Sequence, residues 1–397
     1  MLTVLSWQLL DILVPMRDLS GGTIVQLRRP QRITLVISSL GRGGAERVAV
    51  DLCDFLAKSG RDVSVLTLSG DDPDAYDLPA SVHRRRIEIR QKARSRFQSI
   101  KFTIGHLMEM RRSILALKPD VVLSFIEQTN VRTIGCLIGT GIPVFVSERT
   151  HPGHHSIPRS WAALRRVVYQ LASAVIVQNE DIADWFRKFV PTRRLLTIPN
   201  AIRAPTFLGD HRGRLNEPII LGIGRLAQEK GFDLLLRAFS KAELAVDGWC
   251  IVILGEGEQR EALSKLSRNL EVAKSVDMPG HVPNVSDWIL RSSIFALPSR
   301  YEGFPNALLE AMQLGTACVS FDCPSGPGDL IEDGSNGLLV APNDVDALSQ
   351  ALRKLALNQP LRDRLGREAA KVATTFSMDR VYGLWIETLD SVCQRRL

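Results

Sequence analysis

Short runs of β-branched and aliphatic residues alternate with amphipathic stretches along most of the chain. This alternation is typical of parallel α/β architecture, in which a helix follows each strand. In the first half the apolar runs predict strands at Ile33–Ser38, Val63–Leu68, Val121–Phe125, Val144–Ser147, Ala174–Gln178 and Leu195–Ile198. Stretches with helical periodicity predict helices near Ala45–Lys58, Gln98–Leu117, Arg159–Leu171 and Ile182–Phe189.

A polar stretch without periodicity, Pro199–Pro218, separates this half from a second one in which the pattern restarts. Its Pro and Gly residues are typical of an interdomain linker. The second half predicts strands at Ile219–Ile223, Cys250–Leu254, Ile294–Leu297 and Ala317–Ser320, and helices at Phe232–Lys241, Glu258–Leu270 and Asn306–Leu314. The last 50 residues carry only helical periodicity.

Length and element order together predict two doubly wound α/β domains. The 397 residues exceed one ordinary core and fit two domains of roughly 150–200 residues each. Two such domains in succession place a ligand cleft between them, at the carboxyl ends of their strands. We therefore predict a Rossmann-like domain at 31–199, a linker at 200–217 and a second domain at 218–375, with further segments at 1–30 and 376–397.

Composition places the chain among ordinary globular proteins. Hydrophobic residues make up 45% and charged residues 23%, and no run of about 18 apolar residues predicts a helix across a bilayer. The opening Met1–Met16 is apolar but short, and Gln8 and Asp11 interrupt it. It is therefore either a weak membrane-surface helix or a disordered extension, and not a signal peptide. The six cysteines are scattered without a C-x-x-C pair, which disfavours a zinc module and fits a reducing cytoplasm.

The net charge of +7 is distributed unevenly. Residues 1–205 hold 29 Lys and Arg against 18 Asp and Glu, a net of +11, which leaves −4 for the remainder. The excess is concentrated in RRRIEIRQKARSRFQSIKF, Arg84–Phe102. Such a patch attracts phosphate polymers or anionic lipid, although a solvated charged face has the same pattern. It has only Phe97 and Phe102 as aromatics and matches no nucleic-acid module, which disfavours nucleic acid as a partner.

Two motifs with glycines and cations follow predicted strands. SSLGRGGAERVAVDL places Gly41, Gly43 and Gly44 before a helix, where backbone N–H groups and the helix dipole favour an anion. Its spacing is not G-x-G-x-x-G, so a dinucleotide site is disfavoured, and a purely structural turn is equally open. GIGRLAQEKGFDLLLRAF places Arg225 and Lys230 at a strand-to-helix junction, where two cations either grip a diphosphate or face solvent.

A third motif, PSRYEGFPNALLEAMQLGTACVS, carries two glutamates eight positions apart. Glu302 lies in the loop after the strand that ends at Leu297, and Pro305 suits the first turn of the next helix. Glu310 lies on that helix in an otherwise apolar stretch. A buried carboxylate costs several kcal/mol, roughly, unless donors reach it. Ribose hydroxyls would supply such donors, and a salt bridge on the helix face is the alternative.

These motifs occur in the order expected of the retaining glycosyltransferases of family four, which the chain resembles from Ile33 to about Val381. The matching elements are GRGGAERV, IPNAI, GRLAQEKGFD, LGEGEQR, MPGHVPNV, PSRYEGFPNALLEAMQLG and GSNGLLVAPND. The paired glutamates and GRLAQEKG are the most specific of these. The resemblance implies the GT-B fold, in which two Rossmann-like domains face each other and a final helix, here in 376–397, crosses back to the first domain.

The resemblance also implies roles for individual positions. Arg225 and Lys230 look like the clamp for the donor diphosphate, and Glu310 looks like the ligand of the ribose. Glu302 looks like the catalytic residue that contacts the transferred sugar near its anomeric centre. The other donor-binding positions implied in this way are the backbone of Phe304, Pro305 and Asn306, the base-lining His281 and Val282, and the glycine loop at Gly43 and Gly44.

The implied reaction is sugar transfer with retention of configuration. A covalent intermediate would need a carboxylate on the far face of the anomeric carbon, and the sequence offers Glu302. The resemblance instead favours attack on the face that the diphosphate leaves, with Arg225 and Lys230 stabilising the charge that develops there. We therefore predict that Glu302 is essential without being a nucleophile, and that no metal or other cofactor is needed.

The chain departs from many relatives where the strand Val144–Ser147 ends. Many relatives carry a histidine there, whereas this chain has Glu148 and Arg149, followed by His151. Relatives that build polysaccharide or lipid-linked oligosaccharide often show a similar S-E-R. We therefore expect Glu148, Arg149 and His151 to contact the acceptor.

Two groups of residues could suggest a metal site. His151, His154 and His155 have no carboxylate or cysteine at a suitable spacing, so a metal there is disfavoured. The D-x-D strings at Asp72–Asp74 and Asp344–Asp346 are interpreted as turn or helix-capping residues.

The resemblance leans towards a UDP-activated galactose, N-acetylgalactosamine or N-acetylglucosamine as the donor. A polyprenyl-diphosphate-linked glycan is the first choice as acceptor. Together with the basic first half, this acceptor predicts peripheral binding to anionic lipid at the cytoplasmic face of the inner membrane. A nucleotide-sugar epimerase of the same fold and a nucleic-acid-binding protein are the alternatives.

Overall fold

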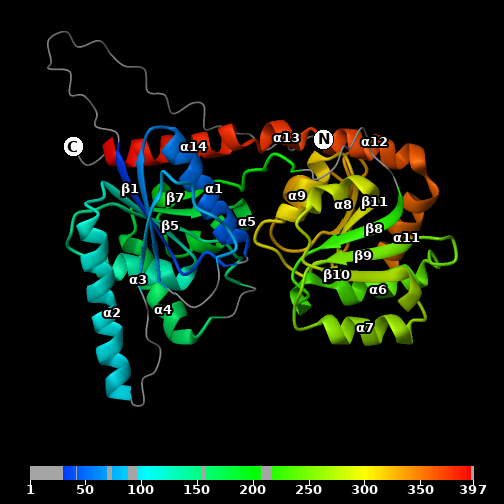
Figure 1. Cartoon of the computed structure of the whole chain (residues 1–397), viewed down its shortest axis with the longest axis horizontal. Coiled ribbons are helices and arrows are strands. Elements are labelled where there is room, and N and C mark those ends of the chain that lie inside the picture. The colour runs from blue at the N-terminus through cyan, green and yellow to red at the C-terminus, as the bar shows by residue number, and fades with distance from the viewer. Residues whose placement is uncertain are drawn as a thin grey trace, which may run out of the picture.

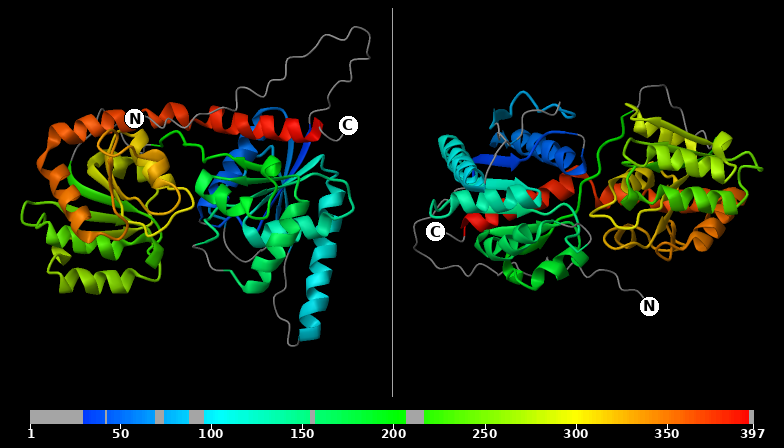
Figure 2. Two further views of the ribbon diagram at one scale, coloured as in Figure 1. Left: turned by 180° about the vertical axis from the view of Figure 1, so that it is seen from behind. Right: turned by 90° about the horizontal axis from the view of Figure 1, so that it is seen from below.

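The computed structural model describes residues 30–41, 43–68, 74–87, 96–153, 157–206 and 217–394. It contains two parallel α/β domains, with a run of C-terminal helices lying along both (Figure 1, Figure 2). The predicted fold class is confirmed, because helices cover both faces of each sheet. None of the helices within these ranges is long and apolar enough to cross a membrane.

The first domain is built on a seven-stranded parallel sheet with the order β3-β2-β1-β4-β5-β6-β7. Its strands are β1 (Arg32–Ile37), β2 (Asp62–Thr67), β3 (His83–Arg86), β4 (Val121–Phe125), β5 (Val144–Ser147), β6 (Ala174–Val177) and β7 (Leu195–Thr197). Its helices are α1 (Gly44–Lys58), α2 (Arg96–Ala116), α3 (Glu127–Leu137), α4 (Arg159–Val168), η1 (Tyr169–Leu171), α5 (Glu180–Arg187) and η2 (Thr192–Arg194). Helix α1 packs on one face of the sheet, and α2 to α5 pack on the other.

The second domain has a six-stranded parallel sheet with the order β10-β9-β8-β11-β12-β13. Its strands are β8 (Glu217–Ile223), β9 (Cys250–Leu254), β10 (Val276–Gly280), β11 (Ser292–Leu297), β12 (Ala317–Phe321) and β13 (Leu338–Val340). Its helices are η3 (Gln228–Lys230), α6 (Phe232–Lys241), α7 (Arg260–Asn269), η4 (Ala273–Ser275), α8 (Val285–Arg291), α9 (Asn306–Gln313), α10 (Pro327–Leu330), α11 (Val345–Leu357), α12 (Gln359–Ala369) and α13 (Val372–Thr375).

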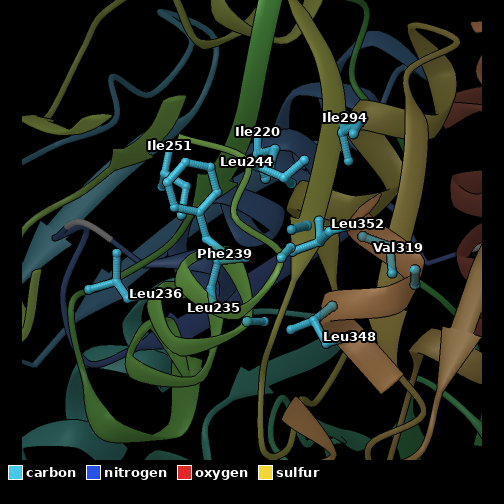
Figure 3. Close-up of a cluster of buried hydrophobic side chains, with 14 of the residues drawn as sticks. Ile220, Leu235, Leu236, Phe239, Leu244, Ile251, Ile294, Val319, Leu348 and Leu352 are labelled. Carbon is cyan, nitrogen blue, oxygen red and sulfur yellow. The ribbon is translucent and has the colours of Figure 1, made fainter. Parts of the chain in front are cut away.

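Aliphatic side chains at helical spacing form the core on one face of the second sheet. Leu235 and Phe239 of α6 and Leu352 of α11 lie against strand residues such as Ile220 and Ile294 (Figure 3). All five are fully buried. Burial of a side chain of this size contributes about 1.5–3 kcal/mol, so this core fixes the strand ends from which the cleft loops emerge.

The last helix, α14 (Met378–Gln394), belongs in packing terms to the first domain. In Figure 1 the helices α12, α13 and α14 run along the top of the molecule from the second domain to the first. Val381, Tyr382, Trp385 and Leu389 of α14 lie in the core of the first domain, where Trp385 stacks on Phe125 with ring centroids 6.0 Å apart. The chain therefore crosses between the domains twice, once near Ile202 and once before α14, and Ile202 bridges Ser377 at this point.

The strands and helices predicted from clear periodicity are present, with ends that differ by at most three residues. Besides the short helical turns η2, η3, η4 and α10, five elements were not predicted. Strand β3 is the basic segment His83–Arg86, β10 contains Pro279, and β13 has only three residues. The buried face of helix α3 includes the polar residues Thr129, Asn130 and Thr133, so α3 has no clear apolar periodicity. Helix α8 is only seven residues long. Of the predicted linker, 207–216 lies outside the described residues, as does Met1–Met16.

Candidate functional site

A cleft of about 1300 Å³ lies between the two domains. The loops after β1, β4 and β5 line it from the first domain, and the loops after β8, β9, β10 and β11 line it from the second. This is the position expected of a ligand site between doubly wound sheets. The predicted donor residues all line this cleft: Gly43, Gly44, Arg225, Lys230, His281, Val282, Glu302, Phe304, Pro305, Asn306 and Glu310.

Lys230 and Glu302 form an ion pair at the floor of the cleft. The Nζ atom of Lys230 donates to both carboxylate oxygens of Glu302, at 2.7 and 2.9 Å. Ser299 Oγ also donates to Oε1 of Glu302, at 2.7 Å, and Glu302 is only 7% exposed. Gly231 makes the approach possible: its φ is +65°, and a Cβ there would lie 1.9 Å from the Pro298 carbonyl oxygen. The backbone after Lys230 is thus pressed against the loop that carries Glu302.

The second predicted cation, Arg225, is held differently. Its guanidinium donates to Glu229 one turn further along, and its side chain is 69% exposed at the rim of the cleft. The hydrogen bond to Glu229 is the main cause that raises the pKa of Arg225 above its usual value. An anion that binds here therefore exchanges with, or shares, the contact to Glu229.

Glu310 contacts the opposite domain in this structure. Its Oε1 lies 2.6 Å from Nη1 of Arg47, which stands on the first turn of α1. The side chains are 20% and 23% exposed, so the pair is largely shielded from water. The salt bridge that the sequence left open for Glu310 is thus present, and its partner is on the other domain.

Asn306 begins α9 and is linked to the first domain by a chain of hydrogen bonds. Asn200 Nδ2 donates to Asn306 Oδ1 at 2.7 Å, and Arg149 Nη2 donates to Asn200 Oδ1 at 2.5 Å. Before Asn306, Phe304 packs its ring towards Phe376, and Pro305 precedes the first helical residue instead of occupying it. Phe304, Pro305 and Asn306 all line the cleft, and the contact with Phe376 holds the Phe304 ring.

The glycine loop of the first domain lies directly over the start of α9. A Cβ on Gly44 would lie 3.3 Å from Asn306 Nδ2, and one on Gly303 would lie 2.4 Å from the Arg149 carbonyl oxygen. These two close approaches bring the domains into contact next to Glu302 and at the start of α9. His281 and Val282 also line the cleft and follow β10, the edge strand of the second sheet.

The three residues expected to contact the acceptor have different surroundings. Arg149 lines the cleft, whereas Glu148 and His151 are not among its lining residues. Glu148 is 2% exposed and accepts a hydrogen bond from Tyr169 OH, with Arg165 3.9 Å away. His151 is 7% exposed and its Nδ1 accepts from the Gly153 backbone N–H. An acceptor contact remains a prediction for all three residues, and in this structure Glu148 and His151 have internal partners.

Arg149 is a poorly neutralised cation. Burial lowers its pKa to about 10. Its Nε is buried without a hydrogen-bond partner, and it forms no ion pair with any described residue. Its guanidinium lies over the Phe125 ring, 5.5 Å from the centroid. A half-buried charge without an ion pair is costly, so an anionic or polar ligand beside Arg149 would be favoured.

Several cleft residues were not identified from the sequence. Arg47 stands in the quoted GRGGAERV and Asn200 in IPNAI, so both lay within matching motifs without an assigned role. Tyr76 and Arg203 also line the cleft, and no motif pointed to them. Arg203 pairs with Asp51 of α1 through Nε, at 2.6 Å.

The acidic strings have structural partners. Asp344 Oδ1 caps α11 by accepting from the Ala347 N–H at 2.9 Å, as predicted. Asp74 pairs with Arg84 and Arg86 of β3. The hydrogen bond from Arg84 is the main cause that lowers the pKa of Asp74. Asp72, His154 and His155 lie outside the described residues, within which no three His, Cys, Asp or Glu side chains gather as a metal site would require.

Two family models match consecutive parts of the chain. The model "Glycosyltransferase Family 4" matches residues 42–204, and "Glycosyl transferases group 1" matches residues 207–372. Together they cover most of both domains and every cleft-lining residue named above.

Curated relatives match over nearly their whole length. The chain is 27% identical over 368 residues to a Campylobacter jejuni GalNAc-α-(1→4)-GalNAc-α-(1→3)-diNAcBac-PP-undecaprenol α-1,4-N-acetyl-D-galactosaminyltransferase, which covers 91% of this chain and 99% of the relative. It is 23% identical over 357 residues to the amylovoran biosynthesis glycosyltransferase AmsD of Erwinia amylovora, covering 88% and 96%.

Solved structures share the fold at lower identity. Sucrose-phosphate synthase from Thermosynechococcus elongatus superposes with a TM-score of 0.76 at 17% identity, over 90% of this chain and 98% of that one. HepE from Anabaena, solved with UDP and glucose, superposes with a TM-score of 0.74 at 17% identity, over 90% and 99%.

Proposed function

Because the chain belongs to the family 4 glycosyltransferases with the GT-B fold, we propose that it moves a hexose or N-acetylhexosamine from a nucleotide-sugar, most simply a UDP-sugar, to a glycan acceptor with retention of configuration. One observation carries the proposal: Lys230, Glu302, Glu310 and Arg47 converge in a single interdomain cleft. Such a set of charges suits a diphosphate, a sugar and a ribose side by side.

The donor would lie with its diphosphate between Arg225 and Lys230 and the start of α9. Lys230 Nζ and the N-terminus of α9 both favour negative charge, and the glycine loop leaves room for the phosphates. Glu310 would accept from the ribose, and His281 with Val282 would border the base. The transferred sugar then falls next to Glu302.

Same-face attack is the mechanism that this geometry supports. Both oxygens of Glu302 accept from Lys230, and Oε1 also accepts from Ser299. Such donors hold the carboxylate and reduce its nucleophilicity. We therefore assign Glu302 to orienting the sugar and stabilising positive charge at the anomeric carbon, while the departing diphosphate takes the acceptor proton and Lys230 stabilises the charge on the leaving group.

The acceptor that we propose is a polyprenyl-diphosphate-linked glycan in the synthesis of a bacterial cell-surface polysaccharide. The relative from C. jejuni named above is one whose name describes a lipid-linked acceptor. In this chain, the poorly neutralised Arg149 on the first-domain wall offers a charged contact to such an acceptor.

A screen of nucleotide-sugars tests the function directly. We expect one donor to release its nucleotide only when a lipid-linked glycan extract is added. Interconversion of nucleotide-sugars without an acceptor would identify an epimerase instead, and salt-sensitive binding of nucleic acid with no turnover would identify a binding protein.

Activity is expected to survive excess chelator, because Arg225 and Lys230 take the place of a divalent ion at the diphosphate. The measurement is the initial rate of transfer with and without EDTA, using enzyme stripped of metal beforehand. Complete loss of activity that magnesium or manganese restores would show that the prediction is wrong.

We propose that the first domain binds the cytoplasmic face of the inner membrane peripherally. Of the nine large hydrophobic side chains that are exposed among the described residues, seven lie on the α2–α4 side of the first domain. They are Ile104, Met108, Leu115, Ile138, Leu164, Val167 and Leu171. The basic run begins at the neighbouring β3, although Asp74 neutralises part of Arg84 and Arg86. Arg90, Lys92 and Arg94 lie outside the described residues.

Binding to liposomes is expected to need acidic lipid and to weaken steeply with salt. Attraction to an anionic leaflet is worth about 1 kcal/mol per basic residue and fades within about 8 Å at physiological ionic strength. Co-sedimentation with neutral and anionic vesicles at rising salt measures this. Equal binding to neutral vesicles at high salt would contradict an electrostatic mode and favour insertion of Met1–Met16.

A further inference from the structure

The ion pair between Arg47 and Glu310 is the clearest feature of the cleft that the proposed function leaves unexplained. Arg47 belongs to the first domain and Glu310 to the second, yet their Nη1 and Oε1 atoms are 2.6 Å apart. An exposed ion pair is worth little, but a shielded pair with one partner removed leaves a costly charge. Arg47 therefore affects whatever Glu310 does.

We propose that Arg47 is a donor-positioning residue, which holds Oε1 of Glu310 across the cleft so that Oε2 faces the ribose. This rests on the proposed function, because it assumes that Glu310 binds the donor. A carboxylate has about four lone-pair sites, so Glu310 can accept from Arg47 and from a ribose hydroxyl together. Arg47 then fixes the orientation of Glu310 without touching the reacting atoms.

The charge balance of the cleft gives Arg47 a second effect. Among the described residues, six Glu side chains and five Lys or Arg side chains line the cleft, so its walls carry no excess of positive charge. A diphosphate entering this space meets Glu310 as a repelling charge unless Arg47 neutralises it. Burial alone would lower the pKa of Arg47, but Glu310, Tyr76 and Asp51 together raise it, so Arg47 stays charged.

The pair also ties the glycine loop to α9. Arg47 stands three residues after Gly44, at the start of the same helix. One turn further on, Asp51 is held by Arg203 of the interdomain segment. Helix α1 is thus attached to the second domain at Glu310 and to the crossing segment at Arg203. Loss of Arg47 would free the end of α1 that carries the glycine loop.

The test is a double-mutant cycle on nucleotide binding. Arg47→Met is expected to raise the Kd of UDP, measured by calorimetry, and the donor KM by about tenfold or more, with kcat changed less than about threefold. Arg47→Lys is expected to recover part of the affinity. In a Glu310→Gln background, Arg47→Met is expected to change Kd less than about twofold, because the charge that it neutralises is gone.

Arg291→Met is the matched control. Arg291 Nε lies 3.0 Å from Glu217 Oε1, and neither residue lines the cleft. Multiplicative effects of Arg47→Met and Glu310→Gln would overturn the inference, and so would tighter UDP binding by Arg47→Met, which would make the pair a competitor of the donor. Melting curves show whether each variant is folded. If Arg47→Met does not fold, Arg47→Lys takes its place in the cycle. If the wild type binds no nucleotide at all, the proposed function itself fails; if it binds and the cycle is multiplicative, only this inference fails.

Discussion

Replacing Lys230 with alanine is expected to lower the maximal rate of transfer by at least about a hundredfold and to weaken donor binding as well. The diphosphate gains negative charge as the sugar leaves, so a cation beside it stabilises the transition state more than the ground state. Removing one preorganised donor from such a site costs about 10²–10³ in kcat. The structure adds a second cost, because Glu302 would keep only Ser299 of its two side-chain donors. Initial rates over a range of donor concentrations separate kcat from KM.

Two further variants control this experiment. Lys241→Ala removes a lysine of the same domain that pairs with Asp346 on the exposed surface, and it is expected to leave the kinetics unchanged. Lys230→Arg keeps the charge with a different shape and is expected to retain part of the rate. Circular dichroism and melting establish that Lys230→Ala is folded. A folded Lys230→Ala with near-normal kcat and donor KM would place the donor site elsewhere.

The fold was largely predictable because most strands are buried on both faces and therefore read as continuous apolar runs. The missed helix α3 shows where this reasoning stops. Its inner face carries Asn130, whose Nδ2 donates to the Ser147 carbonyl and to Tyr169 OH. In the pattern of hydrophobic and polar positions along the sequence, a buried polar residue cannot be told from a surface residue. Strand β3 shows the converse, since an edge strand of basic residues has no apolar signal at all.

The candidate site was predictable within each motif but not between motifs. Local spacing placed Lys230 and Glu302 each after a strand of the second domain, and the structure brings the two side chains together. The contact of Asn200 with Asn306, 106 positions apart, depends on how the two domains face each other. Spacing carries no information on that orientation, so the partners of Glu310 and Asn306 were missed. The sequence also did not show how deeply each residue is buried. Glu148 is adjacent to Arg149 in sequence, but its side chain is buried in the core of the first domain.

Replacing Glu310 with alanine is expected to raise the donor KM by about tenfold to a hundredfold while leaving most of kcat. The ribose does not change during transfer, so its ligand contributes equally to binding of the ground state and the transition state. Loss of a hydrogen bond to a charged group costs about 1.5–3 kcal/mol, which corresponds to that range. Saturating donor is therefore expected to restore much of the rate, in contrast to Lys230→Ala. The measurement is kcat and KM for the donor at fixed acceptor.

The cross-domain ion pair sharpens this prediction. Alanine at position 310 also leaves Arg47 without its carboxylate partner. Glu310→Gln keeps one acceptor oxygen for the ribose while removing the charge, so it is expected to bind the donor better than Glu310→Ala. Both variants need to melt near the wild type for the comparison to hold. A fall in kcat as large as that of Lys230→Ala, with donor KM unchanged, would show that Glu310 acts at the reacting centre and that the ribose lies elsewhere.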